Sequence, residues 1–300
     1  MKKFLRNYRL KAEIGTMKGG IKTISEEIVI SYPLTINFSI TRSEFSQAST
    51  ASFEIFNLKE STRAKLYKDR QDTEKYILLK FYAGYGEDDT KLPMCFCGDV
   101  FECYSYKDGG TTEFKTEIST MSGGTSRTEF ASNFEMAAGT PPLLIIQRLA
   151  SDMHVDIGAI SQTVLSKLSP SARATPFSGN SYEMLSNYVG GHLFIDNNRL
   201  YILDKDDVRL DGVLTLNVDT GLIGTPKRRD SVLEASLIFE PNLELCQLLY
   251  LTSLTAPYMN GQYKVIGFSH NGTISGTIGG QCISSVYLDA KDIFKPVVSL

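Results

Sequence analysis

The sequence has no tryptophan, only three histidines, and no apolar run that approaches ~18 residues. Without such a run, no membrane span is expected. The start of the chain, residues 1–8, carries basic residues but lacks the apolar segment of a signal peptide. The five cysteines are odd in number and form no compact framework, which argues against a disulfide scaffold and favours a chain made in reducing cytosol.

An excess of charge of one sign is also lacking. The formal net charge of the 300 residues is −3, so the composition demands neither nucleic acid nor an anionic membrane as a partner. Phenylalanine and tyrosine are plentiful, at 16 and 15 residues, and this mixture suits β-strands. The length corresponds to two or three domains.

The first part of the chain, residues 1–130, is predicted to be mainly strands. Alternation with a period of two places Leu34, Ile36, Phe38 and Ile40 on one face. Residues 15–20 are expected to form a loop, residues 59–67 a short helix, and residues 108–110 a hairpin turn. The predicted strands cover residues 10–14, 28–32, 34–42, 51–58, 76–85, 94–106 and 111–121.

The middle of the chain, residues 131–214, reads as a small α/β insert. A helix is predicted over 143–150, with Thr140 as its N-cap and Pro141 or Pro142 in its first turn. A second helix over 178–188 is stopped by Gly190-Gly191. Residues 192–203 are predicted to be a hairpin that turns at Asn197-Asn198.

Residues 215–300 return to strands. A turn at 219–226 is followed by apolar strands over 233–239, 243–251 and 262–272, at the short spacing typical of a small sandwich or barrel. Asn271-Gly272 is the strongest local hairpin signal, because both residues tolerate positive φ. The hairpin at 263–278 resembles the one at 97–121, which suggests an internal duplication. Residues 290–300 read as a tail.

Three cysteines lie close together in the sequence, at Cys95, Cys97 and Cys103. Period-two geometry puts all three on one strand face. A zinc site would need a Cys-x₂-Cys pair together with further Cys or His ligands, and no histidine lies nearby in the sequence. Packing in the core is therefore the favoured interpretation.

The other polar motifs are also interpreted as structural. Residues 267–272 resemble the Gly-x-Ser-x-Gly motif of a nucleophile elbow but lack its final glycine. His154 and His192 have no ligand-pair spacing. Residues 204–207 resemble a calcium loop without the glycine, so a solvated turn is favoured. The clusters of charge at 227–229 and 87–89 are expected to be solvated loops, although the basic cluster Lys227–Arg229 could contact a partner. No catalytic residue, cofactor ligand or metal ligand is assigned.

Six segments carry a resemblance to a known family. They are 51–63 (ASFEIFNLKESTR), 81–85 (FYAGY), 96–100 (FCGDV), 219–226 (DTGLIGTP), 239–243 (FEPNL) and 261–272 (GQYKVIGFSHNG). Together they resemble the baseplate hub proteins of tailed, contractile-type bacteriophages, a family similar to late control protein D and to the N-terminal hub part of type VI secretion spikes. One departure is Cys246-Gln247, where the family often has a glycine before the strand.

The resemblance implies a mainly β fold with two tail-tube-like β-barrel domains, residues 1–130 and 215–300, around the α/β insert 131–214. It implies a non-enzymatic homotrimer whose six barrels give pseudo-sixfold symmetry. Such a trimer would join the hexameric tail tube to the trimeric spike around a channel for DNA and the tape-measure protein. It would be assembled in the host cytoplasm and reside in the virion baseplate.

Two alternatives from other classes remain open on the residues. One is a tail-associated peptidoglycan hydrolase, although no pair of carboxylates is marked for glycoside hydrolysis. The other is a carbohydrate-binding β-sandwich, which would share the same pattern of short strands.

Overall fold

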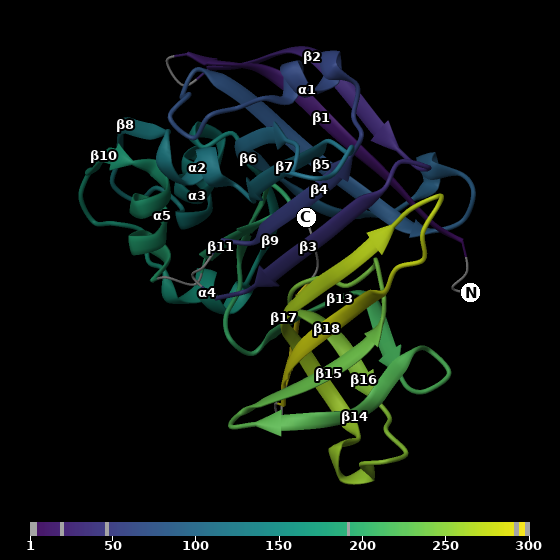
Figure 1. Cartoon of the computed structure of the whole chain (residues 1–300). Coiled ribbons are helices and arrows are strands. Elements are labelled where there is room, and N and C mark those ends of the chain that lie inside the picture. Colours follow the sequence, from purple (N-terminus) through teal and green to yellow (C-terminus); the bar gives the residue numbers. More distant parts are fainter. Residues whose placement is uncertain (1–4, 19–20, 46–47, 191–192, 291–293, 298–300) are drawn as a thin grey trace.

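A long strand, β17 (Gly261–Ile274), joins the two halves of the main sheet in the computed structural model (Figure 1). The sheet has 14 strands, and its main path runs β14-β15-β18-β17-β3-β4-β7-β6-β5-β1-β2. Strand β16 pairs with β17 and β13, and β13 pairs with β19. The structure describes all residues except 1–4, 19–20, 46–47, 191–192, 291–293 and 298–300.

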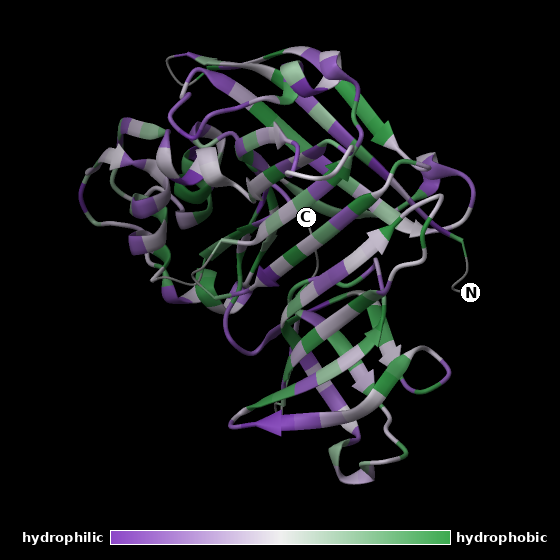
Figure 2. Ribbon diagram, viewed as in Figure 1, coloured by the Kyte–Doolittle hydropathy of each residue, from purple (hydrophilic) through white to green (hydrophobic). Residues whose placement is uncertain are grey.

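The N-terminal half of the sheet encloses the largest core. Alternation along β3 and β4, visible as bands in Figure 2, buries Ile36, Phe38 and Ile40 as the sequence predicts. Phe239, Ile274 and Cys282 from the C-terminal half complete this core. The elements of this half are β1 (Arg6–Lys18), β2 (Ile21–Ser31), β3 (Ile36–Ser43), β4 (Thr50–Phe56), α1 (Glu60–Leu66), β5 (Lys75–Tyr85), η1 (Asp89–Lys91), β6 (Met94–Tyr106) and β7 (Lys115–Met121).

The insert has its own core and lies beside the N-terminal half (Figure 1). Helices α3 and α5 pack with two small sheets, β10-β8 and β11-β12-β9. The elements are α2 (Gly124–Thr128), β8 (Ala131–Met136), α3 (Pro142–Asp152), β9 (Asp156–Ile160), α4 (Gln162–Lys167), β10 (Thr175–Asn180), α5 (Ser181–Val189), β11 (Leu193–Asp196) and β12 (Arg199–Ile202).

The C-terminal half forms a third core. Its strands β14, β15 and β18 extend the main sheet beyond β17, while β13 and β16 lie off the main path. The elements are β13 (Asp207–Leu216), β14 (Leu222–Arg229), β15 (Val232–Ile238), β16 (Gln247–Leu251), η2 (Pro257–Met259), β18 (Cys282–Asp289) and β19 (Lys295–Val297).

The predicted hairpin turn at Asn271-Gly272 is wrong. Strand β17 continues through both residues, which pair with Ser39 and Phe38 of β3. Gly272 is required for close packing, because a Cβ atom there would lie 2.5 Å from Cys282 Sγ. The strand ends at Ile274, and the chain turns over residues 275–281 before β18.

Four smaller predictions also fail. Strand β1 extends to Lys18 instead of looping out at Gly15, which lies in a bulge against β2. Strand β14 begins at Leu222, inside the turn predicted over 219–226. The residue before α3 is Pro141, and Thr140 Oγ1 bonds to Ala137 O instead of capping the helix. The expected tail contains β19, which pairs with β13.

Other predictions are confirmed: helix α1, the β6–β7 hairpin, and the insert hairpin that turns at Asn197-Asn198. Gly190 ends α5 in a left-handed conformation, as expected of a helix C-terminus. Gly191 and His192 lie outside the described residues. The fold is mainly β, as predicted, but the main path of strand pairing ends at β14 and β2 among the described residues. The two-barrel layout therefore stays a prediction.

Candidate functional site

A buried ion pair joins the insert to the main sheet. Arg42 of β3 donates from Nε to Asp196 Oδ1 at 2.9 Å and from Nη2 to Oδ2, and the side chains are 3% and 2% exposed. Ser49 Oγ also donates to Asp196, at 3.2 Å. Arg42 Nη1 donates to Cys95 O at 3.1 Å, and the guanidinium lies 4.9 Å from the ring centre of Phe268. Strand β3, the insert and β17 therefore meet at one guanidinium.

The turn of the insert hairpin docks beside this pair. Asn197 and Asn198 both have positive φ, which asparagine tolerates. Asn197 Oδ1 accepts a hydrogen bond from Cys97 N at 2.9 Å, and Asn198 N donates to Ser122 Oγ at 3.4 Å. A Cβ atom at Gly123 would lie 2.5 Å from the Ile195 side chain, so glycine allows the hairpin to approach this closely.

A second buried charge cluster connects the two halves of the main sheet. Lys264 of β17 is 1% exposed and lies 2.8 Å from Glu44 Oε2, which also accepts a hydrogen bond from Cys246 Sγ at 3.0 Å. Burial disfavours the charged lysine, but Cys246 and Glu44 outweigh it and hold the pKa of Lys264 above its ordinary value. Cys246 has a φ of 61°, a left-handed backbone conformation that glycine adopts most easily.

The three clustered cysteines are in the core, as predicted, but they do not share one face. Strand β6 has two irregularities that each interrupt the period-two alternation. Its register against β5 shifts at Cys95, between Met94 and Phe96, and its register against β7 shifts between Val100 and Glu102. Cys95 and Cys103 pack in the N-terminal core, whereas Cys97 packs with Tyr76 and Leu78. Burial raises the pKa of all three thiols to about 12, so they are poor nucleophiles and metal ligands at neutral pH.

The residues of the rejected elbow motif form part of a strand. His270 is fully buried, and its Nδ1 lies 2.7 Å from Ser284 Oγ. Burial, together with the nearby Arg42 charge, lowers the pKa of His270 to about 3, so the ring is neutral. His154 is exposed and its ring contacts Phe130 edge-on, a packing role of the predicted kind.

The acidic residues at 204–207 do not form a solvated turn. Asp204 and Asp207 are 8% and 1% exposed, and Asp207 Oδ2 accepts a hydrogen bond from Asp204 N at 2.7 Å. Lys167 Nζ lies 2.8 Å from Asp204 Oδ2. Among the described residues, no group of three or more His, Cys, Asp and Glu side chains could hold a metal ion.

The basic cluster 227–229 is part of a strand, not a loop. It ends β14, where its three residues pair with β15 and their side chains are exposed. Strand β14 lies at one end of the pairing path and β2 at the other. Three apolar residues of β2 are exposed, namely Ile21, Ile24 and Val29, as is Ile223 of β14. A strand at the edge of a sheet has one side without a partner strand. Where such a strand also exposes apolar side chains, a further chain can pair with it.

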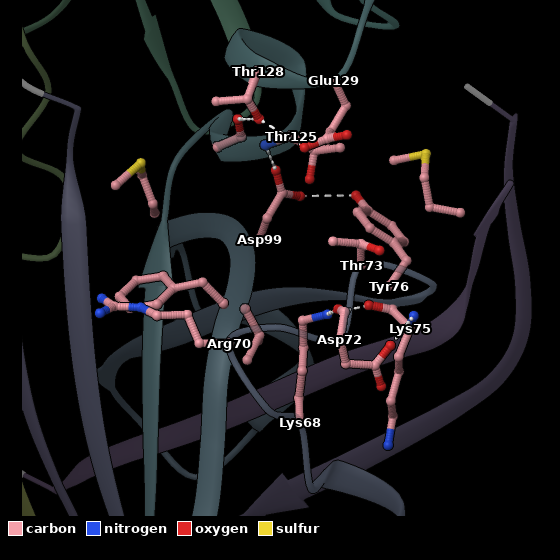
Figure 3. Close-up of a pocket in the computed structure, with 15 residues that line it drawn as sticks. Lys68, Arg70, Asp72, Thr73, Lys75, Tyr76, Asp99, Thr125, Thr128 and Glu129 are labelled. Atoms are coloured by element: carbon pink, nitrogen blue, oxygen red, sulfur yellow. Dashed lines mark hydrogen bonds between the residues drawn. The ribbon is translucent and has the colours of Figure 1, made fainter. Parts of the chain in front are cut away.

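A cavity of about 350 Å³ lies between the N-terminal half and α2 (Figure 3). Asp99 accepts hydrogen bonds from Tyr76 Oη at 2.9 Å and Thr125 N at 2.8 Å. Lys68 Nζ donates to Asp72 O at 2.7 Å, and burial lowers its pKa. These polar groups bond to protein atoms instead of pointing into the cavity. No pattern in the sequence predicts this cavity, because its lining comes from several separate segments between residues 17 and 129.

No helix in the described part of the chain is long and apolar enough to cross a membrane. No curated protein matches the sequence. Among solved structures, the chain resembles the 43 kDa tail protein of prophage MuSo2 from Shewanella oneidensis, with a TM-score of 0.55 and 9% identity over 92% of this chain and 96% of that one.

Two further structures share the fold. A tail protein from Neisseria meningitidis MC58 matches with a TM-score of 0.51 and 10% identity, over 95% of this chain and 98% of that one. The E. coli c3393 protein, a type VI secretion component, matches with a TM-score of 0.55 and 9% identity, over 87% of this chain and 75% of that one. At these identities the likeness shows the fold alone.

The sequence itself carries the family assignment. The family model of the baseplate hub gp41 matches residues 16–271, which include most of the main sheet and the whole insert. The chain therefore belongs to the baseplate hub gp41 family of phage tail proteins.

Proposed function

We propose that this protein is the structural, non-enzymatic hub of a phage baseplate, a homotrimer with pseudo-sixfold symmetry. It would join the hexameric tail tube to the trimeric spike and surround a channel for DNA and the tape-measure protein. Membership of the baseplate hub gp41 family supports a place in the virion tail, with assembly in the host cytoplasm as the preceding step. The observation that carries the proposal is one continuous sheet with two cores, whose main path ends at β14 and β2 in the part of the chain that the structure describes.

The proposed domains are residues 1–130 and 215–300, each with a tube-like β unit, and the insert 131–214 between them. Each unit has its own apolar core, and β17 pairs with strands of both units. The Arg42–Asp196 pair and the Lys264–Glu44 pair would fix the angle between the parts, because each buried charge is satisfied only when its partner is in place.

The free ends of the sheet would form the contacts between subunits. Among the strands that the structure describes, β2, with 11 residues, pairs only with β1, and β14, with eight residues, pairs only with β15. Pairing β2 of one subunit with β14 of the next is a heterologous contact, which closes into a ring when the rotation is one third of a turn. The basic residues Lys227 and Arg228 lie on β14, and Glu26 and Glu27 lie on β2, where they pair with Lys65 and Lys11 of the same subunit.

The test is the mass of the purified protein. Light scattering at high concentration is expected to give about 100 kDa, three times 33.3 kDa. Lysines at two exposed β2 positions, Ile24→Lys with Val29→Lys, should abolish the trimer without unfolding the subunit, whereas Ala172→Lys on an exposed loop of the insert should not. A strictly monomeric wild-type protein, with no tail partner restoring assembly, would contradict the proposal.

A further inference from the structure

Part of one face of the main sheet carries mostly small hydroxyl side chains. Two rows of residues in register cross from the C-terminal half to the N-terminal half of the sheet. We call nine of these residues the hydroxyl face: the first row is Ser236, Ser285, Ser269, Thr41 and Thr50, and the second is Asn271, Ser39, Ser52 and Ser119. Beyond Asn271 the second row continues into two apolar residues, Ile283 and Ile238.

These side chains are not buried and have no structural task. Five of them are exposed and the other four are half-buried, while the alternate residues of the same strands point into the cores. Within the described part of the chain, none of the nine side chains makes a hydrogen bond to another protein group. Serine is not among the residues that favour strands, so folding alone does not explain six serines here.

The chemistry of the face excludes two common uses. Protein interfaces are enriched in aromatic residues, methionine and arginine, and are depleted in serine. A surface that holds nucleic acid neutralises phosphates with lysine and arginine, and the nine residues include neither. On one flank lie Glu54 and Glu117, and both carboxylates pair with Lys115 of the next row. On the other flank Glu234 faces Lys227, so neither flank carries an excess of positive charge.

We infer that the hydroxyl face lines the channel of the trimer and that duplex DNA slides past it without being held. Short neutral side chains leave the passage wide and hydrated, and the nine residues offer no cation that could hold a phosphate. The rows cross six strands, from β15 to β7, and so include strands of both β units, and each of the three subunits would contribute one such stretch to the wall. This inference rests on the proposed trimeric hub and assigns the face that surrounds its channel.

The native cysteines allow a specific label to test this geometry. All five are buried, at no more than 7% exposure, so a single Ser52→Cys variant presents one accessible thiol per subunit. The purified assembly is labelled with a small gold-cluster maleimide and imaged by electron microscopy. We expect gold at the centre of the ring for Ser52→Cys, and also for Thr41→Cys if the first variant fails to fold. Gold should lie away from the axis for Ala172→Cys, on an exposed loop of the insert.

The outcomes separate the two proposals. Rings with gold on their rim in the face variants overturn the inference and leave the trimeric hub intact. Wild-type protein that forms no ring overturns the proposed function itself, and the channel with it.

A second measurement tests the lack of DNA affinity. The wild-type ring should not retain duplex DNA, whereas Ser39→Lys with Ser52→Lys adds six cations per trimer to the wall. The affinity gained should then fall about 1,000-fold or more between 50 and 200 mM salt. Lysines at Ala172 and Ala174 serve as the matched control and should bind more weakly. Tight binding by the wild type, or equal binding by face and control variants, would overturn the inference.

Discussion

Replacing Asp196 with alanine tests the junction between β3 and the insert. The change removes a carboxylate that is 2% exposed. Among the described residues it leaves the Arg42 guanidinium, 3% exposed, with the Cys95 carbonyl as its one hydrogen-bond acceptor. Removing one partner of a buried ion pair costs about 3–5 kcal/mol, because the remaining charge stays desolvated and uncompensated. At about 2–4 °C per kcal/mol, the melting temperature should fall by about 6–20 °C in calorimetry.

Two variants make the result interpretable. Glu135→Ala removes an exposed carboxylate from β8 of the same insert and should change the free energy of unfolding by no more than about 0.5 kcal/mol. Arg42→Met with Asp196→Leu removes both charges, and such replacements are often neutral, so most of the lost stability should return. If the double variant were as unstable as Asp196→Ala, an uncompensated Arg42 charge could not be the cause.

Three further predictions concern the cores. Neutral His270, with its pKa lowered to about 3 by burial, stabilises the fold fully above pH 6.5 and progressively less as the pH falls toward 3. Urea unfolding at pH 7 and pH 5 should show a loss of about 2 kcal/mol that His270→Asn abolishes, and an unchanged pH dependence would contradict this. Gly272→Ala should cost about 1–3 kcal/mol through the contact with Cys282, whereas Gly279→Ala, with no atom within 4 Å, should be nearly neutral. Equal stabilities would count against the strand register. Cys95, Cys97 and Cys103 should resist Ellman's reagent until the protein unfolds, because a pKa near 12 leaves about 1,000-fold fewer thiolates than a pKa near 9. Rapid labelling of the folded wild type would refute this.

The sequence determined most of the individual elements. Period-two alternation is a property of neighbouring residues along one strand, so it predicted β3 and its buried face without any knowledge of β17. The turn of the insert hairpin could also be predicted from neighbouring residues alone, because asparagine at 197 and 198 tolerates positive φ wherever the hairpin docks. The family resemblance rested on such local segments, and the family model confirmed it.

The tertiary structure decided what the same local signals mean. Asn271-Gly272 suits a turn, yet strands on both sides pair with it, and Gly272 is needed because Cys282 and Phe38 crowd its position. Arg42 and Asp196 are 154 residues apart in the chain, and no pattern in the sequence predicts that they form a pair. Local sequence sets the conformations that a segment can adopt. Packing against distant strands selects one of them, because burial and charge pairing depend on neighbours that only the folded chain brings together.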